Sequence, residues 1–294
     1  MTNTLGSVLK KYNSRIGRLS GQYAIEIEAE FSRSLGEHYV DGFLTTTDNS
    51  LRGYGYEFIS RKPESKQVLM EQVDTLLKEP FFERYIDSTR TSTHVHVNVC
   101  NWTHEQLLQV LLTYYIVEPY ISEFAGQSRQ SNLFCLRMYD AEDVMNILKK
   151  VVDQDWSYVA SERAFNTYKY SALNVASIGR LGSIEFRQMR GTKDVTEINR
   201  WLNLIDSVIN YALSFRSIDD VWAAFSRSSS DFFTRATGHN VVDTYRYDNN
   251  YSNVFCLYNY YKDAPKRIST GKYVCPYDFG KSPFVLEFGE RVVV

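Results

Sequence analysis

The sequence predicts an α+β protein, in which helices cover the apolar face of a largely antiparallel sheet. Three observations support this class. Apolar residues alternate with glutamates over residues 23–30, valines alternate with histidines over residues 93–99, and several intervening segments repeat apolar residues every three or four positions. Alternation is the period of a strand, and the longer spacing is that of a helix. Helices gathered on one face leave the other face of the sheet open.

The strand expected at residues 23–30 is the centre of this arrangement. Ile25, Ile27 and Ala29 point to one face and the three glutamates 26, 28 and 30 to the other. Neighbouring carboxylates repel one another, so a bound cation would explain their alignment. Exposure to solvent is the alternative explanation, because outward-facing strand positions often carry acids.

The remaining elements follow from caps, turns and periodicity. Residues 1–22 form an unassigned lead-in, and residues 31–47 are expected to be irregular. In order, the expected elements are a turn at 48–55, a strand at 56–60, a helix at 65–78, a strand at 93–99, a helix from Thr103 to about Val117 where Pro119 interrupts, a strand at 132–138, a helix capped by Asp140 and ending at Lys150, a hairpin of 170–176 with 182–189, a helix from Asp194 to Ala212, and a helix at 218–225.

Composition limits the protein class. The 294 residues are 44% hydrophobic and carry a net charge of −2, which gives no basic footprint for nucleic acid. We expect one domain over residues 1–294, with a catalytic core at 23–225 and a tyrosine-rich extension at 226–294. Four cysteines without a Cys-x-x-Cys pair, a polar N-terminus and the lack of a long apolar run predict a cytoplasmic protein without a membrane span. Oligomeric state is not predicted.

Ionisable residues recur on the open face of four expected strands. They are Glu26, Glu28, Glu57, His94, His96, Glu185 and Arg187. Carboxylate oxygens suit Mg²⁺ or Mn²⁺, while Arg187 or Arg190 could neutralise phosphate oxygens. The His-x-His pair leaves a zinc hydrolase as an alternative, with both imidazoles and one acid as ligands.

The order of these motifs resembles the amidoligase family, which is similar to the glutamine synthetase and glutamate–cysteine ligase superfamily of carboxylate–amine ligases. The motifs are Glu-x-Glu at 26–28, Asp-x-Ser-Leu at 48–51, Gly-x-Glu-Phe-Ile-Ser at 55–60, His-Val-His-Val-Asn at 94–98, and Ser-Ile-Glu-Phe-Arg at 183–187 followed by Gly-Thr and a long helix. The resemblance covers residues 21–225. Ala24, Asn49 and Ser92 stand where the family more often has glycine.

The resemblance implies a glutamine-synthetase-like sheet with helices on its convex face, and ATP with two or three Mg²⁺ or Mn²⁺ ions on its concave face. Glu26 and Glu28 would each bind a different ion, with Glu57 completing one shell and His94 with Glu185 completing the other. His96 would face a phosphate or the substrate, and Arg187 the transferred phosphoryl group. Lys169, Arg129 and Asn98 are further candidates for contact with a nucleotide or an acidic substrate, with solvation as the alternative for Lys169 and Arg129.

The function implied is an ATP-dependent ligase that joins a small-molecule or peptide carboxylate to an amine through an acyl phosphate. Asp48 and Glu30 are candidates to accept the proton of the amine. A thiol nucleophile at Cys100 is conceivable, although a small buried side chain at a strand end explains the residue as well. A phosphotransferase using the same site, and a binding or assembly protein with an inert site, remain as alternatives.

Overall fold

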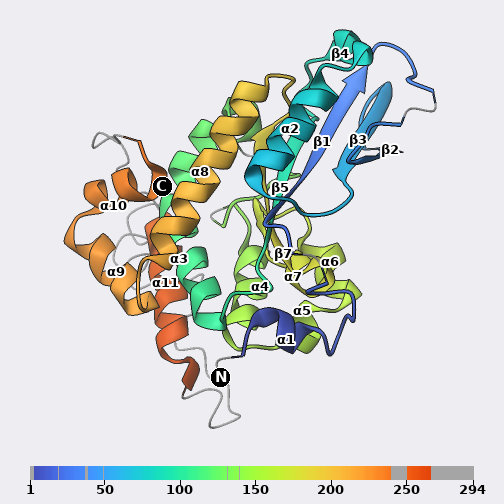
Figure 1. Ribbon diagram of the computed structural model, residues 1–294. Coiled ribbons are helices and arrows are strands. Elements are labelled where there is room, and N and C mark those ends of the chain that lie inside the picture. The colour runs from blue at the N-terminus through green and yellow to red at the C-terminus, as the bar shows by residue number, and fades with distance from the viewer. Residues whose placement is uncertain are drawn as a thin grey trace, which may run out of the picture.

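The computed structural model describes residues 3–18, 20–36, 39–48, 50–130, 132–138, 140–239 and 250–265 (Figure 1). Within these residues seven strands form one sheet, whose order is β2-β3-β1-β5-β7-β6, with β4 also paired to β1. The strands are β1 (Tyr23–Phe31), β2 (Phe43–Thr47), β3 (Tyr54–Ser60), β4 (Tyr85–Ile86), β5 (Ser92–Asn98), β6 (Leu173–Asn174) and β7 (Ser183–Arg190). All pairs of these strands are antiparallel. The α+β class is confirmed.

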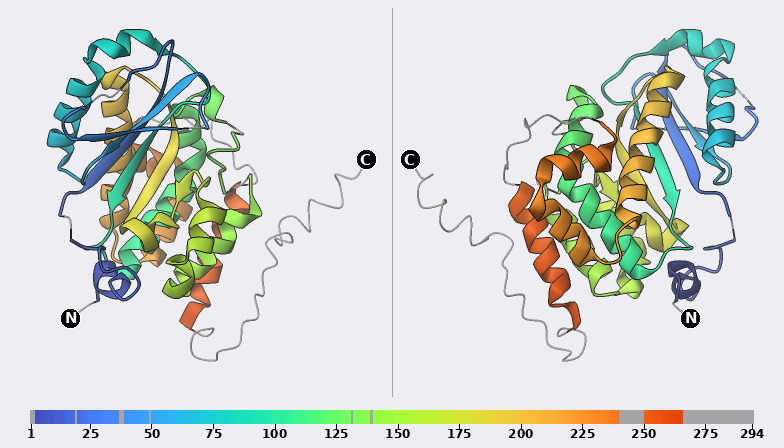
Figure 2. Two further views of the ribbon diagram at one scale, coloured as in Figure 1. Left: turned by 90° about the vertical axis from the view of Figure 1, so that its right-hand side faces the viewer. Right: turned by 60° about the vertical axis from the view of Figure 1, so that its left-hand side comes forward.

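Three long helices cover one face of the sheet. They are α2 (Lys66–Leu77), α3 (His104–Phe124) and α8 (Val195–Leu213). Helix α2 packs on β1 and α8, and α3 packs on α8 and β7. When the molecule is turned by 90° so that the right-hand side of Figure 1 faces the viewer, the strands lie in front of α8 (Figure 2, left). Ile25 and Ile27 are fully buried on the helical side, as their alternation with the glutamates predicts.

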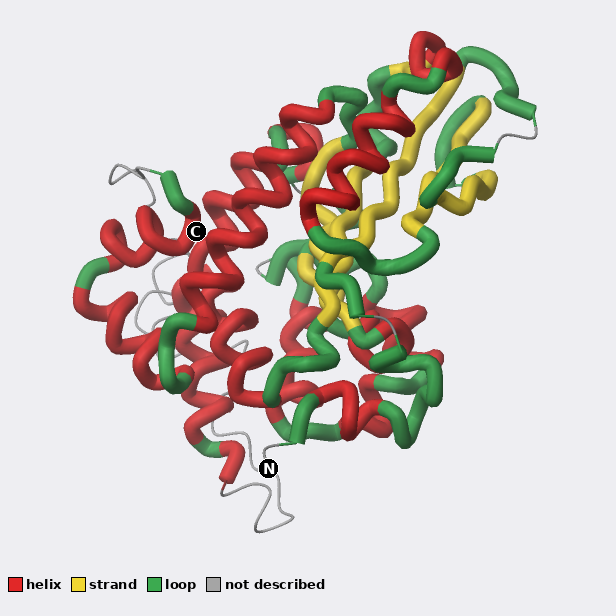
Figure 3. Tube along the Cα trace, in the orientation of Figure 1, coloured by secondary structure: helices red, strands yellow, loops and turns green. Residues whose placement is uncertain are grey.

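The remaining helices lie beside and beneath this unit, as the red segments of Figure 3 show. Four lie near β6 and β7: α4 (Glu142–Val152), α5 (Trp156–Val159), α6 (Glu162–Tyr168) and α7 (Ser177–Leu181). The others are α1 (Leu5–Leu9), α9 (Ile218–Arg227), α10 (Ser229–Thr237) and α11 (Asn250–Lys262), together with 3₁₀ turns at Pro80–Arg84 and Gln127–Arg129. Helices α9, α10 and α11 pack on α3, so the hydrophobic core extends from Leu5 to Ala264.

Several predicted elements are confirmed close to their predicted bounds. The Thr103 capping box opens α3, and Asp194 caps α8 by accepting a hydrogen bond from the Thr196 amide. The predicted hairpin pairs β6 with β7, although its connection is the short helix α7. The helices expected at 65–78 and 218–225 correspond to α2 and α9.

The end predicted for the helix that begins at Thr103 is wrong. Helix α3 passes through Pro119 and ends at Phe124. A proline inside a helix loses one backbone hydrogen bond and crowds the preceding turn. Burial of Ile121 and Ala125 on the far side of Pro119 offsets this cost.

Two predictions between α3 and α4 are also wrong. Residues 132–138 form a loop rather than a strand, and only Leu136 makes an isolated bridge, to Ser171. Asp140 does not cap α4, whose first cap residue is Ala141. The Asp140 carboxylate instead accepts two hydrogen bonds of 2.8 Å from the Arg137 guanidinium.

Helices and strands also occur in segments for which the sequence predicted no regular secondary structure. Residues 1–22 contain α1, residues 31–47 contain β2, and the tyrosine-rich extension contains α10 and α11. Residues 240–249 and 266–294 of that extension lie outside the described residues. No helix among the described residues is long and apolar enough to cross a membrane.

Candidate active site

The sheet register aligns the predicted site residues across neighbouring strands. Strand β1 lies between β3 and β5, and β5 lies between β1 and β7. The cross-strand pairs are Glu26 with His94, Glu28 with Glu57, and His96 with Glu185. Because directly paired residues point to the same face, these six side chains lie on the side opposite the long helices.

Arg187 lies on the same side of the sheet, next to an irregularity in the pairing of the strands. The pairing of β5 with β7 shifts between Thr93 and Val95, where β7 holds one residue more than β5. Arg187 follows Glu185 by two residues and therefore lies on the same side of the strand, whereas the next residue, Gln188, accepts a hydrogen bond of 2.8 Å from Tyr114 of α3. Beyond this bulge, Met189 pairs with Thr93 and Arg190 pairs with Ser92.

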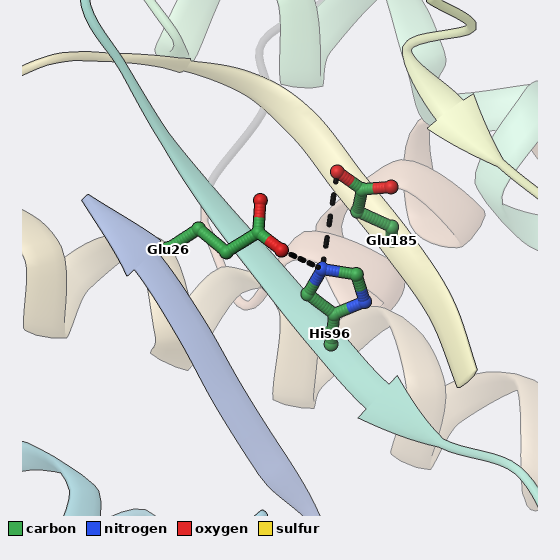
Figure 4. Close-up of side chains that lie close together, drawn as sticks. All are labelled: Glu26, His96 and Glu185. Atoms are coloured by element: carbon green, nitrogen blue, oxygen red, sulfur yellow. Dashed lines mark hydrogen bonds and ion pairs between the residues drawn. The ribbon is translucent and has the colours of Figure 1, made fainter. Parts of the chain in front are cut away.

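Glu26, His96 and Glu185 form a compact cluster on three adjacent strands (Figure 4). The His96 Nε2 atom lies 3.0 Å from Glu26 Oε1 and 3.9 Å from Glu185 Oε1. Each residue offers one ligand atom, and these atoms lie within 4.8 Å of one another. Two carboxylates and an imidazole at this separation fit a single divalent cation.

His94 lies beside the same two carboxylates. Its Nδ1 atom is 3.2 Å from Glu26 Oε2 and 3.5 Å from Glu185 Oε1, while its Nε2 atom is 2.6 Å from the Ser92 hydroxyl. Both imidazoles are thus near Glu26. The assignment of His94 to an ion and His96 to a phosphate or the substrate stays a prediction.

Glu28 and Glu57 form a second pair of acids. Ser92 donates a hydrogen bond to Glu28. Burial, together with the negative charges of Glu26, Glu28 and Asp48, raises the pKa of Glu57 to about 8. Crowded carboxylates of this kind would be relieved by a cation bound between them.

The central cluster is charged and internally paired. Burial opposes ionisation of Glu26 and by itself would raise its pKa. The interactions of Glu26 with His96 and His94 have a larger, opposite effect and hold the Glu26 pKa well below its usual range. Burial likewise opposes ionisation of Glu185, where Arg187 and His96 keep the pKa low. Burial disfavours the His96 imidazolium, yet Glu185 and Glu26 raise its pKa. The His96 imidazole and Arg187 therefore supply positive charge beside these acids.

Two supporting side chains were not identified from the sequence. The buried Asn174 amide donates a hydrogen bond of 2.8 Å to Glu185 Oε2, and the Ser183 hydroxyl lies 3.1 Å from His96 Nδ1. Such partners fix the orientation of ligand side chains. Counting across the predicted hairpin from its ends at residues 176 and 182 would place Asn174 opposite Ile184, so its direct pairing with Glu185 needed the structure.

Two pockets adjoin the central cluster. The first, which we call the polar pocket, has a volume of about 210 Å³. Its charged lining residues are Glu28, Asp48, Glu57, Arg90, Lys169 and Arg187, and Ser50, Ser92, His94, Phe134 and Tyr170 complete it. Acids and cations thus share one cavity.

The second, which we call the apolar pocket, also has a volume of about 210 Å³. Its lining includes Ala24, Ile25, Ile59, Pro63 and Leu181, with Arg15, Arg61, Lys62 and Asn98 among the polar residues. Glu26 and His96 line this pocket, whereas His94 and Arg187 line the polar one. The cluster therefore lies between the two pockets.

Two predicted cationic residues lie outside the cluster. Arg190 pairs with Glu197 of α8 at 2.5 Å. The buried Arg129 donates hydrogen bonds to the backbone carbonyls of Gln188 at 3.2 Å and Arg187 at 3.0 Å. Arg129 thus supports the strand that carries Arg187, and Lys169 is the candidate that reaches the polar pocket.

The two candidate proton acceptors differ in their surroundings. Glu30 is buried and accepts a hydrogen bond of 2.7 Å from the Arg52 amide, whereas Asp48 lines the polar pocket. Cys100 lines the apolar pocket, and burial raises the pKa of its thiol, which disfavours the nucleophilic thiolate. Asn98 donates a hydrogen bond of 2.9 Å to the Gly21 carbonyl and accepts one from the Cys100 amide.

Comparison with known sequences agrees with the resemblance read from the motifs. A sequence model of the family described as "Putative amidoligase enzyme" matches residues 18–209. This span contains all seven strands and the predicted site residues. No curated protein matches the chain significantly. The match covers well over half of the sequence, and the chain therefore belongs to the amidoligase family.

Proposed function

We propose that the protein is an ATP-dependent carboxylate–amine ligase that forms an amide bond through an acyl phosphate. The observation that carries this proposal is the position of the cluster of Glu26, His96 and Glu185 between an apolar pocket and a pocket lined by both acids and cations. Such a ligase must hold a nucleotide and two further reactants around one group of ions. The family to which the chain belongs supports ligase activity.

The donor set fits Mg²⁺ or Mn²⁺. Glu26 and Glu185 with an imidazole would hold one ion, and Glu28 with Glu57 a second. Bound there, the ions would neutralise the phosphate oxygens of ATP and stabilise the charge that moves during transfer. Arg187 adds a fixed positive charge beside Glu185.

The residues that line the two pockets suggest which reactant each pocket binds. A nucleobase is flat and largely apolar, so the apolar pocket suits it, with the phosphates directed toward the cluster. In the polar pocket, Lys169 and Arg187 can hold a carboxylate or the γ-phosphate, and Asp48 is the candidate to accept a proton from the amine.

Two displacements complete the proposed reaction. A carboxylate oxygen of the substrate attacks the γ-phosphorus of ATP, so ADP leaves and an acyl phosphate forms. The amine then attacks the acyl carbon, phosphate leaves, and the amine proton passes to the acceptor. The protein contributes positioning and charge neutralisation, which dominate catalysis of phosphoryl transfer.

The test is a product analysis. The protein is incubated with Mg²⁺, ATP and a panel of carboxylates and amines, and ADP and amide are followed by mass spectrometry. We expect amide formation that requires both partners and is lost in Glu185→Gln, with the exposed α2 variant Glu71→Gln as control. A stable phosphorylated product that forms equally without amine would instead identify a phosphotransferase.

A further inference from the structure

Two partly exposed aromatic rings lie together in the polar pocket. Phe134 and Tyr170 are 40% and 37% exposed, and their ring centroids are 5.5 Å apart in an edge-to-face arrangement. Aromatic surface exposed to water is unfavourable. The packing of the protein alone therefore does not explain why these two rings remain partly exposed. Because the two rings line a cavity, a molecule bound in that cavity would bury their exposed surface.

The backbone holds the two rings in place. Phe134 belongs to the loop 132–138, and Tyr170 precedes β6. The Leu136 amide donates to the Tyr170 carbonyl, and the Ala172 amide donates to the Leu136 carbonyl, each at 2.7 Å. These bonds join the two segments directly beside the rings, so the pair is a preformed surface.

Charged groups lie next to this surface. The Lys169 ammonium is 4.9 Å from the centroid of the Tyr170 ring, and Arg187 lines the same pocket. A molecule that reaches both kinds of group must combine an anionic end with an apolar or ring-bearing part. The apolar pocket on the other side of the cluster already suits a nucleobase, which leaves the aromatic pair for the second reactant.

We propose that Phe134 and Tyr170 select the carboxylate substrate, and that this substrate carries an apolar or aromatic group that packs on the two rings while its carboxylate faces Lys169 and Arg187. The inference rests on the proposed ligase function, since it assigns the polar pocket to the carboxylate substrate. Phe134 and Tyr170 are thus specificity-determining residues, and small carboxylates without an apolar group are poor substrates.

The test compares two simple acids. Binding of 3-phenylpropanoate and propanoate is measured by ligand-observed NMR titration, with Mg²⁺ and a non-hydrolysable ATP analogue present. We expect 3-phenylpropanoate to bind about tenfold more tightly than propanoate. Phe134→Ala and Tyr170→Ala should remove the difference, whereas Tyr170→Phe, which keeps the ring, should retain it.

Leu133→Ala is the matched control, because Leu133 is on the same loop, is 74% exposed and is not among the residues that line the polar pocket. Equal binding of the two acids, or an unchanged difference in Phe134→Ala, overturns the inference. Weaker binding of the ATP analogue in Phe134→Ala also overturns it, because the rings would then serve the nucleobase. A different result would contradict the ligase proposal itself: the unmodified protein would then not bind the ATP analogue in a Mg²⁺-dependent manner.

Discussion

Glu57 lies directly opposite Glu28 in the antiparallel pairing of β3 with β1, so two carboxylates share one cross-strand position on the site side of the sheet. Like charges in this arrangement destabilise a sheet unless one is protonated or a cation lies between them. This relationship leads to the first two predictions.

Replacing Glu57 should stabilise the metal-free protein at high pH. Burial and the neighbouring acids raise the Glu57 pKa from 4.5 to about 8, so the folded state loses stability as pH rises from the unfolded value toward 8. Glu57→Gln removes that loss. We expect a gain of about 1–2 kcal/mol in urea unfolding at pH 9 and little change at pH 4, the gain being reduced by solvent screening at this half-buried group. An equal effect at both pH values would contradict the assignment.

Ion binding should release a proton from Glu57. A carboxyl group must be ionised to bind a metal, and the raised pKa keeps Glu57 protonated at pH 7 in the metal-free protein. Titration calorimetry with Mn²⁺ in two buffers of different ionisation enthalpy measures the number of protons released. We expect close to one proton from the unmodified protein and fewer from Glu57→Gln; identical values in the two proteins would exclude Glu57 as a ligand.

The Ser183 hydroxyl should support metal affinity through His96. It lies 3.1 Å from Nδ1, which leaves Nε2 facing Glu26 and Glu185. Ser183→Ala should therefore weaken Mn²⁺ binding about tenfold with little change in melting temperature. Unchanged affinity in Ser183→Ala would contradict the role of His96 as the ligand imidazole.

Arg129 should act as a positioning residue for Arg187. Its guanidinium bridges two consecutive carbonyls of β7, which a lysine ammonium cannot do with the same planar geometry. We expect Arg129→Lys to cost about 1–3 kcal/mol of stability. The kcat of amide formation should fall with KM nearly unchanged.

Arg137→Lys is the matched control for Arg129→Lys, because Arg137 pairs with Asp140 nearer the surface, and its stability should change by about 0.5 kcal/mol or less. Full activity in Arg129→Lys, once the folded fraction is matched, would remove the positioning role.

The sequence predicted the centre of the site because alternation determines which face each residue takes. Glu26, His94 and His96 follow from the parity of two strands whose valine and isoleucine positions are unambiguous. The same reasoning on two further expected strands placed Glu57 and Glu185 on that face. The register that pairs Glu28 with Glu57 needed the structure, since strand pairing depends on turns that parity does not determine.

Other features depend on long-range contacts that local patterns do not contain. Arg190 resembles a phosphate ligand in the sequence, but it lies where Glu197 of α8 can pair with it. The bulge beside Arg187 has no sequence signature. Residues 132–138 are apolar enough to resemble a strand, yet Cys135 turns inward while Phe134 is partly exposed in the polar pocket.

Metal-dependent nucleotide binding tests the central claim most directly. Binding of a non-hydrolysable ATP analogue is measured by calorimetry with and without Mg²⁺, in the unmodified protein and in a folded Glu26→Gln, Glu28→Gln double variant, with Glu71→Gln as control. We predict Mg²⁺-dependent binding that is retained in the control and lost, by at least about a hundredfold, in the double variant. Absence of binding in the unmodified protein, or equal binding in the double variant, would contradict the assignment of these strands to a metal–ATP site.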